Sequence, residues 1–220
     1  MVEAVLRRSR RRAVERMALA AAEYASMGWP VCVGAYPPTR QRHDDILRSC
    51  SCDRVGCPAP GAHPMSPAWQ VQATVDPATV ENWWLAQPEA NVILATGRVF
   101  DVLDVPAAAG ATALTQMERS AVRPGPVAIS AGNRALFFVT TRGRPADEEE
   151  WWSCHLDCEP EMVSQVAGLR WHCRDSYVLA PPSRDGYAVK SHWLRPPEHR
   201  PLPDGLRLLE FLADACEEVS

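Results

Sequence analysis

Three cysteines and one histidine stand close together early in the chain: Cys50, Cys52, Cys57 and His63. Thiolates and an imidazole are ligands that zinc prefers, and four protein ligands close a tetrahedral structural site. A closed site has no open position for water, so we expect the metal to stabilise this loop and not to activate a nucleophile. His43 is an alternative fourth ligand. The alternative interpretation is that these are adventitious thiols beside a surface histidine and that they bind no metal.

A looser group of possible metal ligands follows later in the chain: Cys154, His155, Cys158, His172 and Cys173. These side chains would converge on a second metal if the segment after the acidic run at 147–150 packed on the strand predicted near residue 170. Buried free cysteines beside neighbouring tryptophans explain the same residues. Both interpretations stay open at this stage.

The composition indicates a chain that can bury its own core. Of its 220 residues, 46% are hydrophobic, which fits one large domain better than two. No stretch reaches the run of about 18 apolar residues that a membrane span needs. The eight cysteines, grouped with histidines, favour metal ligation in a reducing compartment over disulfides, which predicts a cytoplasmic protein. The formal net charge of −4 argues against a strong duplex-DNA binder, so any nucleic-acid contact would be local.

We expect three parts along the chain. A basic N-terminal arm covers residues 1–12, and its arginines at 7–12 are either solvated or in contact with phosphates. The main domain covers 13–200 and contains the zinc loop at 50–64. A C-terminal helix at 201–220 packs on that domain.

The hydrophobic periodicity predicts an α+β fold with a mixed sheet. Asp76 and Pro77 form a helix start, and Gly132 with Asn133 links two strands into a hairpin. The closing helix is expected to bury Leu206, Leu209, Ala213 and Cys216. The other expected helices cover about 10–27 and 107–120, and the expected strands cover 29–34, 92–96, 99–105, 127–130, 135–140, 169–173, 177–180 and 187–193.

Several motifs in a fixed order then resemble one family. They are Gly28-Trp29-Pro30-Val31, the Cys50 to Pro64 loop, Asn82-Trp83-Trp84 with Ala90-Asn91, Ala95-Thr96-Gly97, Asp101 to Asp104, and Tyr177 to Ser183. Over roughly residues 15–195 this set resembles the bifunctional DNA primase/polymerase N-terminal domain of the archaeo-eukaryotic primase superfamily, in particular its actinobacterial members. The resemblance implies an RRM-like catalytic sheet, joined to an N-terminal αβ unit with a zinc loop, that uses nucleotides with Mg²⁺ or Mn²⁺.

The catalytic residues that the resemblance implies are mostly replaced. The Asp-x-Asp pair of the family would fall on Asp104 and Pro106, its histidine near Ala135, and its third acidic residue on Arg170. Two-metal catalysis needs carboxylates that share one face of the strand, and proline cannot ligate a metal. We therefore expect Asp104 to remain as the remnant of the site and to form a buried ion pair with Arg170.

Three functions are open. The first is a catalytically impaired primase/polymerase-like protein that binds nucleotide, single-stranded nucleic acid or a replication partner, with Arg134, Arg170, Arg174 and Trp171 lining the cleft; Trp171 is alternatively a core residue. The second is an active nucleotidyltransferase that holds metal through another carboxylate set. The third is a protein-interaction module without a nucleic-acid role, suggested by two tandem tryptophan pairs. The carboxylates of the second function would be Asp101 and Asp104 with Asp157 or Asp175, and the tryptophan pairs of the third are Trp83-Trp84 and Trp151-Trp152.

Overall fold

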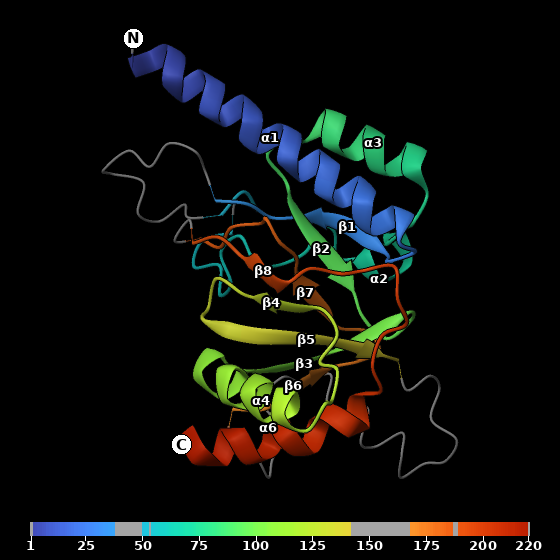
Figure 1. Cartoon of the computed structure of the whole chain (residues 1–220). Helices are drawn as coiled ribbons and strands as arrows, with labels where there is room; N and C mark the ends of the chain where they lie inside the picture. Colours follow the sequence, from blue (N-terminus) through green and yellow to red (C-terminus); the bar gives the residue numbers. More distant parts are fainter. Residues whose placement is uncertain (1, 38–49, 53, 142–167, 187–188, 220) are drawn as a thin grey trace. The chain divides into compact units, whose positions relative to one another are not determined.

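A computed structural model describes residues 2–37, 50–52, 54–141, 168–186 and 189–219, and for residues 2–13 it describes the backbone alone. The chain divides into two compact units. Unit 1 contains Met1–Leu94 and Leu179–Ser191, and unit 2 contains Ala95–Val178 and His192–Ser220. The predicted α+β class is confirmed, and the strands form a three-stranded sheet of order β1-β2-β7 and a five-stranded sheet of order β6-β3-β5-β4-β8 (Figure 1).

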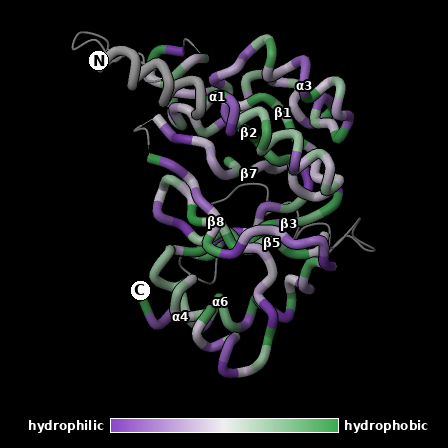
Figure 2. The backbone as a smooth tube through the Cα atoms, turned by 45° about the horizontal axis from the view of Figure 1, so that its top comes forward, coloured by the Kyte–Doolittle hydropathy of each residue, from purple (hydrophilic) through white to green (hydrophobic). Residues whose placement is uncertain are grey.

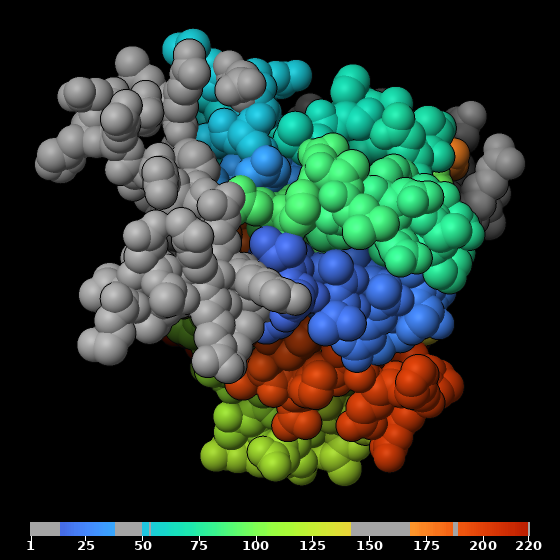
Figure 3. Space-filling view, turned by 90° about the horizontal axis from the view of Figure 1, so that it is seen from above, coloured from blue at the N-terminus to red at the C-terminus, as the bar shows by residue number. Residues whose placement is uncertain are grey.

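Unit 1 begins with a long helix that packs on its sheet. Helix α1 (Val2–Ser26) starts earlier than the expected 10–27 and contacts β1 (Val31–Gly34) and α3 (Pro77–Ala86). Figure 3 shows α1 and α3 side by side on the surface of the unit. The buried side of α1 includes Tyr24, whose hydroxyl donates to the carbonyl of Pro181 at 2.6 Å. That bond ties the helix to the segment that follows β7 (Tyr177–Leu179).

Strand β2 (Asn91–Ala95) forms the middle of the first sheet and is buried along its whole length. It pairs antiparallel with β1, with Val33 opposite Val92. Figure 2 shows hydrophobic residues along both strands, which is the pattern expected of strands covered on two faces. The short helix α2 (Trp69–Gln72) and helix α3 lie between β1 and β2 in the chain. The predicted start of α3 is confirmed, because the Asp76 carboxylate accepts from the amide of Thr79 at 2.8 Å.

Unit 2 is an antiparallel sheet with helices packed on it. Strand β3 (Phe100–Pro106) pairs with β5 (Arg134–Thr140) and with β6 (Arg170–His172), and β4 (Val127–Ile129) joins β5 to the edge strand β8 (His192–Arg195). The predicted hairpin of β4 and β5 is confirmed, with Asn133 in its turn at φ 57. Helix α4 (Ala107–Arg119) and helix α6 (Gly205–Val219) pack against each other and against β3.

The register of β3 separates two faces of this sheet. Leu103 and Val105 belong to the hydrophobic core under the helices, together with Phe137 and Val139 of β5. Because alternate residues on a strand share a face, Asp104 points to the opposite face of the sheet.

The predicted buried face of α6 is confirmed at Cys216 and is displaced by one residue at its other positions, although Leu209 still packs partly buried against the core. The helix buries Gly205, Leu208, Leu212 and Ala215, together with Cys216, while Leu206 is 52% exposed. The spacing is as expected, but leucines at 206, 208, 209 and 212 allow two possible faces. Gly205 settles the choice, because a Cβ built there lies 3.1 Å from Val139 and 3.4 Å from Trp171, so the helix start meets the sheet closely.

Candidate functional site

The four predicted metal ligands lie together in unit 1. One ligand atom each of Cys50, Cys52, Cys57 and His63 lies within 4.8 Å of the other three. In the part of the chain that the structure describes, this is the one group of three or more cysteine, histidine or acidic side chains close enough to hold a metal ion. His43, the alternative ligand, lies outside the described residues.

The hydrogen bonds around these ligands orient them toward a common centre. The Nδ1 of His63 lies 2.7 Å from the carbonyl oxygen of Pro64. A carbonyl only accepts, so Nδ1 carries the proton and Nε2 keeps the lone pair that a metal requires. That Nε2 lies 3.3 Å from the Sγ of Cys50, and the same sulfur accepts a hydrogen bond from the amide of Gly61 at 3.3 Å.

The loop is held to the first sheet by backbone bonds and by one buried side chain. The amide of Ala35 donates to the carbonyl of His63 at 2.8 Å. Asn91 is fully buried, and its Nδ2 lies 2.7 Å from the carbonyl of Gly61, 2.9 Å from that of Ala35 and 2.5 Å from that of Arg184. Asn91 therefore joins the end of β1, the cysteine loop and the 184 segment at one point.

The thiols interact strongly with one another. Burial opposes ionisation of Cys52, but hydrogen bonds from the Arg54 amide and from the side chains of Cys50, His63 and Cys57 lower its pKa to about 7. Burial raises the pKa of Cys57, and the neighbouring Cys52 and Cys50 add to the rise, to about 11. One thiolate thus opposes the formation of the next. A dication would remove that conflict, since it favours every ligand in its ionised form.

This set of donors fits a metal ion such as zinc. Three sulfurs and one imidazole nitrogen are soft ligands in the number and proximity that a tetrahedral site needs. All four come from the protein, so such an ion would be structural. The arrangement can brace the loop, and it offers no position for a substrate.

The looser second group does not assemble among its described members. Cys173 is buried in the core under the helices, whereas His172 lies on the other face of β6, directed at Asp104. Consecutive residues of a strand point to opposite faces, so these two cannot share a metal. Cys154, His155 and Cys158 lie outside the described residues.

Asp104 is the centre of a polar cluster on the face of the second sheet that lies away from the helices. Its Oδ1 accepts from the Nε of Arg134 at 2.5 Å, and its Oδ2 lies 3.2 Å from the Nε2 of His172. Arg134 also donates through Nη2 to the backbone oxygens of Asp104 at 3.0 Å and Gly168 at 2.5 Å. The side chain of Asp104 is 6% exposed and that of Arg134 is 19% exposed, so the pair is largely desolvated.

The predicted ion pair between Asp104 and Arg170 is wrong in its partner. The two residues lie opposite each other on β3 and β6, as expected, and therefore share a face. The carboxylate nevertheless pairs with Arg134 and His172 within the described residues. Arg134 reaches the carboxylate because its position on β5, opposite Pro106, lies on the same face as Asp104.

The structure also bears on Ala135, near which the catalytic histidine of the family was expected to fall. Ala135 belongs to the core under the helices, so no side chain at that position would face Asp104. On the Asp104 face β5 presents Arg134, Leu136, Phe138 and Thr140, of which Leu136 lies directly opposite Asp104.

Two further predicted cleft residues have different environments. Trp171 is 5% exposed and belongs to the core under the helices, as the alternative interpretation of this residue expected. It is therefore not available for stacking on a base. Arg174 is exposed, with its Nε 3.6 Å from the exposed carboxylate of Asp175. Asp101 is buried and lies on the opposite face of β3 from Asp104, so these two carboxylates cannot hold one metal ion. Asp157 lies outside the described residues.

Sequence reasoning missed the role of His172. Its Nε2 must donate, because the carboxylate of Asp104 only accepts, and its Nδ1 lies 3.0 Å from the hydroxyl of Ser176. The signal was present in the sequence, since Arg170 and His172 are two residues apart on a predicted strand and hence share a face.

Comparison with known proteins places this arrangement in a family. The model of the family described as bifunctional DNA primase/polymerase, N-terminal, matches residues 21–205. A search of curated proteins found no match. The family match covers both the cysteine loop of unit 1 and the Asp104 face of unit 2, which is more than half of the chain. The chain therefore belongs to the bifunctional DNA primase/polymerase N-terminal family.

Proposed function

We propose that this chain is a catalytically impaired primase/polymerase-like protein that binds a nucleotide or single-stranded nucleic acid on the Asp104 face. The observation that carries the proposal is the engagement of the Asp104 carboxylate by Arg134 at 2.5 Å and by His172 at 3.2 Å. A guanidinium and an imidazole thus lie where a metal-dependent enzyme of this family is expected to present its ions.

The residue types support loss of metal-dependent transfer. Two-metal catalysis needs carboxylates that clamp both ions, and Mg²⁺ is held by carboxylates together with phosphate oxygens. On the Asp104 face, the next position along β3 is Pro106 and the position opposite on β6 is Arg170. Neither is a metal ligand. One carboxylate that is already bound to a cation is a poor site for two more.

The same replacements favour binding of an anion. Arg134 and Arg170 stand on one face with one carboxylate, Asp104, among the described residues of β3, β5 and β6, so these three strands carry a net positive charge there. Guanidinium groups bind phosphates through paired hydrogen bonds and need no metal to do so. A triphosphate could therefore be held here without Mg²⁺.

The cysteine loop has a supporting role in this proposal. We infer that its ion is Zn²⁺, because three thiolates and one imidazole in a closed tetrahedron are typical of structural zinc. Free thiols of this kind also favour a reducing compartment, so we place the protein in the cytoplasm. No helix among the described residues has the length and apolar character to cross a membrane. A role in DNA replication with a partner protein, and an actinobacterial type, remain predictions.

The test combines a binding and an activity measurement. ATP and dATP are titrated into the protein with EDTA and with Mg²⁺, and primer synthesis and extension are assayed with Mg²⁺ and Mn²⁺. We expect binding that persists in EDTA, weakens about tenfold in Arg170→Gln, and changes less than twofold in the control Arg119→Gln, which removes an exposed arginine of α4.

The outcomes separate the three functions. We expect no template-dependent extension. Extension that requires metal and disappears in Asp104→Ala would show an active nucleotidyltransferase and overturn the proposal. Failure to bind ATP, dATP or a short single-stranded oligothymidylate titrated in the same way would leave the protein-interaction function.

A further inference from the structure

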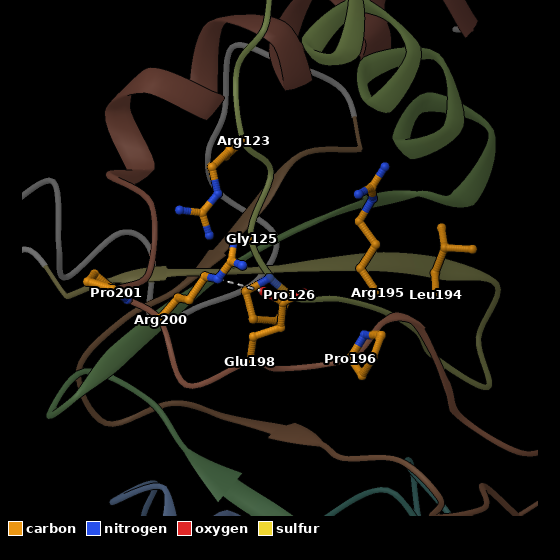
Figure 4. A pocket seen from close by; sticks show the side chains of 9 residues that line it. All are labelled: Arg123, Gly125, Pro126, Leu194, Arg195, Pro196, Glu198, Arg200 and Pro201. Carbon is orange, nitrogen blue, oxygen red and sulfur yellow. Dashed lines mark ion pairs between the residues drawn. The ribbon is translucent and has the colours of Figure 1, made fainter.

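A second cationic site lies at the far edge of the five-stranded sheet in unit 2. The segment at 123–126, which enters β4, and the segment at 194–201, which ends β8 and continues beyond it, line a cavity of about 350 Å³ that is open to solvent on one side. Arg123, Arg195 and Arg200 line it together with Glu198, and Figure 4 shows their side chains around Gly125 and Pro126. None of these residues belongs to the Asp104 face.

A β-bulge in β8 explains how two neighbouring residues line the same cavity. Val127 pairs with Arg195, whereas the next residue, Ala128, pairs with Trp193. Leu194 is therefore the extra residue of the bulge. Adjacent side chains of a regular strand point to opposite faces, but a bulge turns the strand locally and re-aims them. Leu194 and Arg195 consequently both line the cavity.

The other wall is held in place by a tight backbone approach. Gly125 has φ +70, and a Cβ built there would lie 2.5 Å from the Cδ of Pro203. The carbonyl of Pro203 in turn accepts from the amide of Thr140 on β5 at 2.8 Å. The 123–126 wall thus lies against the chain at Pro203, just after the 194–201 wall, and Pro203 is in turn hydrogen-bonded to β5.

The cavity carries an excess of positive charge. Three arginines face one carboxylate, in a chain whose formal net charge is −4. Glu198 pairs with Arg200 at 3.1 Å, but both side chains are more than 60% exposed (63% and 64%), so water weakens that pair. Arg123 and Arg195 form no ion pair with any residue that the structure describes. Clustered like charges repel one another, and a bound anion relieves that repulsion.

We propose that this cavity binds the phosphate backbone of a single-stranded nucleic acid without a metal ion. Guanidinium groups match phosphate oxygens through paired hydrogen bonds. Leu194 and the prolines at 126, 196 and 201 supply apolar surface for sugar or base. The choice of a nucleic-acid strand over a free anion rests on the proposed function, whereas the presence of an anion site does not.

The experiment measures binding of a fluorescein-labelled 20-residue oligothymidylate by anisotropy, in EDTA and at several salt concentrations. The variant Arg123→Gln/Arg195→Gln removes two cations from the cavity. Its control, Arg119→Gln/Arg207→Gln, removes two exposed arginines from α4 and α6 and changes the net charge equally. Arg123→Lys/Arg195→Lys keeps the charge and checks for folding defects.

We expect the cavity variant to bind at least about tenfold more weakly, and its plot of log affinity against log salt to be shallower by about 1.4, because each phosphate contact to a single strand contributes about 0.7. The control should change less than about twofold, and the lysine variant should recover most of the slope. Equal losses in the cavity variant and the control would overturn the proposal, as would an unchanged slope in the cavity variant.

Competition distinguishes the source of the phosphate. If inorganic tripolyphosphate binds wild type and not the cavity variant while oligothymidylate binds both equally, the cavity is a free-anion site and the proposal fails. Nucleotide binding in Arg170→Gln reports on the Asp104 face alone. If Arg170→Gln loses nucleotide binding but still binds the oligothymidylate through the cavity of Arg123 and Arg195, the two sites act independently.

Discussion

The ion pair between Arg134 and Asp104 gives the sharpest energetic prediction. Breaking a buried pair by removing one partner is costly, because the other charge stays desolvated, whereas apolar replacement of both partners is often nearly neutral. Arg134→Met removes the hydrogen bond to the Asp104 carboxylate and the donors to the backbone oxygens of Asp104 and Gly168. Hydrogen bonds to charged groups contribute about 1.5–3 kcal/mol each, and those to neutral groups about 0.5–1.5 kcal/mol.

The partial exposure of Arg134, at 19%, lets water recover some of this loss. We therefore expect Arg134→Met to lower the free energy of unfolding by about 2–4 kcal/mol. Asp104→Leu leaves the Arg134 guanidinium without its carboxylate partner and should lower the free energy of unfolding by a similar amount. The double variant should cost clearly less than the sum of the two, with an interaction energy of about 1.5–3 kcal/mol.

The assay is urea unfolding of wild type, both single variants and the double variant. Hydrogen exchange of the β3 and β5 amides serves as a local reading, because two-state unfolding is not guaranteed in a chain that divides into two compact units. Additive single effects, with an interaction energy below about 0.5 kcal/mol, would refute the reasoning. They would mean that Arg134 stabilises the sheet through its backbone contacts alone and does not replace a metal ion electrostatically.

Three further predictions concern unit 1. Cys57→Ser should lower the bound zinc well below one ion per chain in elemental analysis and lower the melting temperature, whereas Cys216→Ala, at a buried thiol outside the cluster, should keep the zinc; full zinc in Cys57→Ser would contradict the ligand assignment. Asn91→Ala should destabilise unit 1 by about 2–4 kcal/mol in urea unfolding, because it leaves the buried carbonyls of Ala35 and Gly61 without the two N–H groups of the amide; a loss under about 1 kcal/mol would show that water replaces the side chain. Hydrogen bonds from the Thr79 side chain and amide lower the pKa of the Asp76 carboxyl in the folded protein. The ionised carboxylate should therefore stabilise α3 fully at pH values above the pKa of Asp76 in the unfolded chain. This stabilisation should be lost as the pH falls through the lower pKa of the folded protein. The melting temperature of Asp76→Ala should then lie a few degrees below wild type at pH 7 and approach it in acid, and a difference that is constant with pH would refute the charge-dependent part of the cap.

Much of the candidate site follows from local sequence. Cys50, Cys52 and Cys57 lie so close in the chain to His63 that few loop conformations could separate them, and the structure places their ligand atoms together. The start of α3 at Asp76 and the turn of the β4 and β5 hairpin at Asn133 are also local, because each depends on a side chain and its own neighbouring backbone. The proposal that Pro106 and Arg170 stand where the family carries carboxylates likewise comes from the order of motifs in the sequence.

Other features depend on how distant segments meet, and the sequence left them open or misplaced them. The partner of Asp104 is Arg134 and not Arg170, because the ladder between β3 and β5 places Arg134 on the same face and its long side chain spans the offset. Helix α6 buries the face that begins at Gly205, where a Cβ would lie as close as 3.1 Å to Val139 and 3.4 Å to Trp171, so the missing side chain favours this close approach. Arg123 and Arg195 meet across a bulge whose register appears only when β4 and β8 pair. Residue types and short spacings thus determine which chemistry the chain can carry, whereas strand register and helix docking decide which of those groups face one another, since both depend on contacts between segments far apart in the chain.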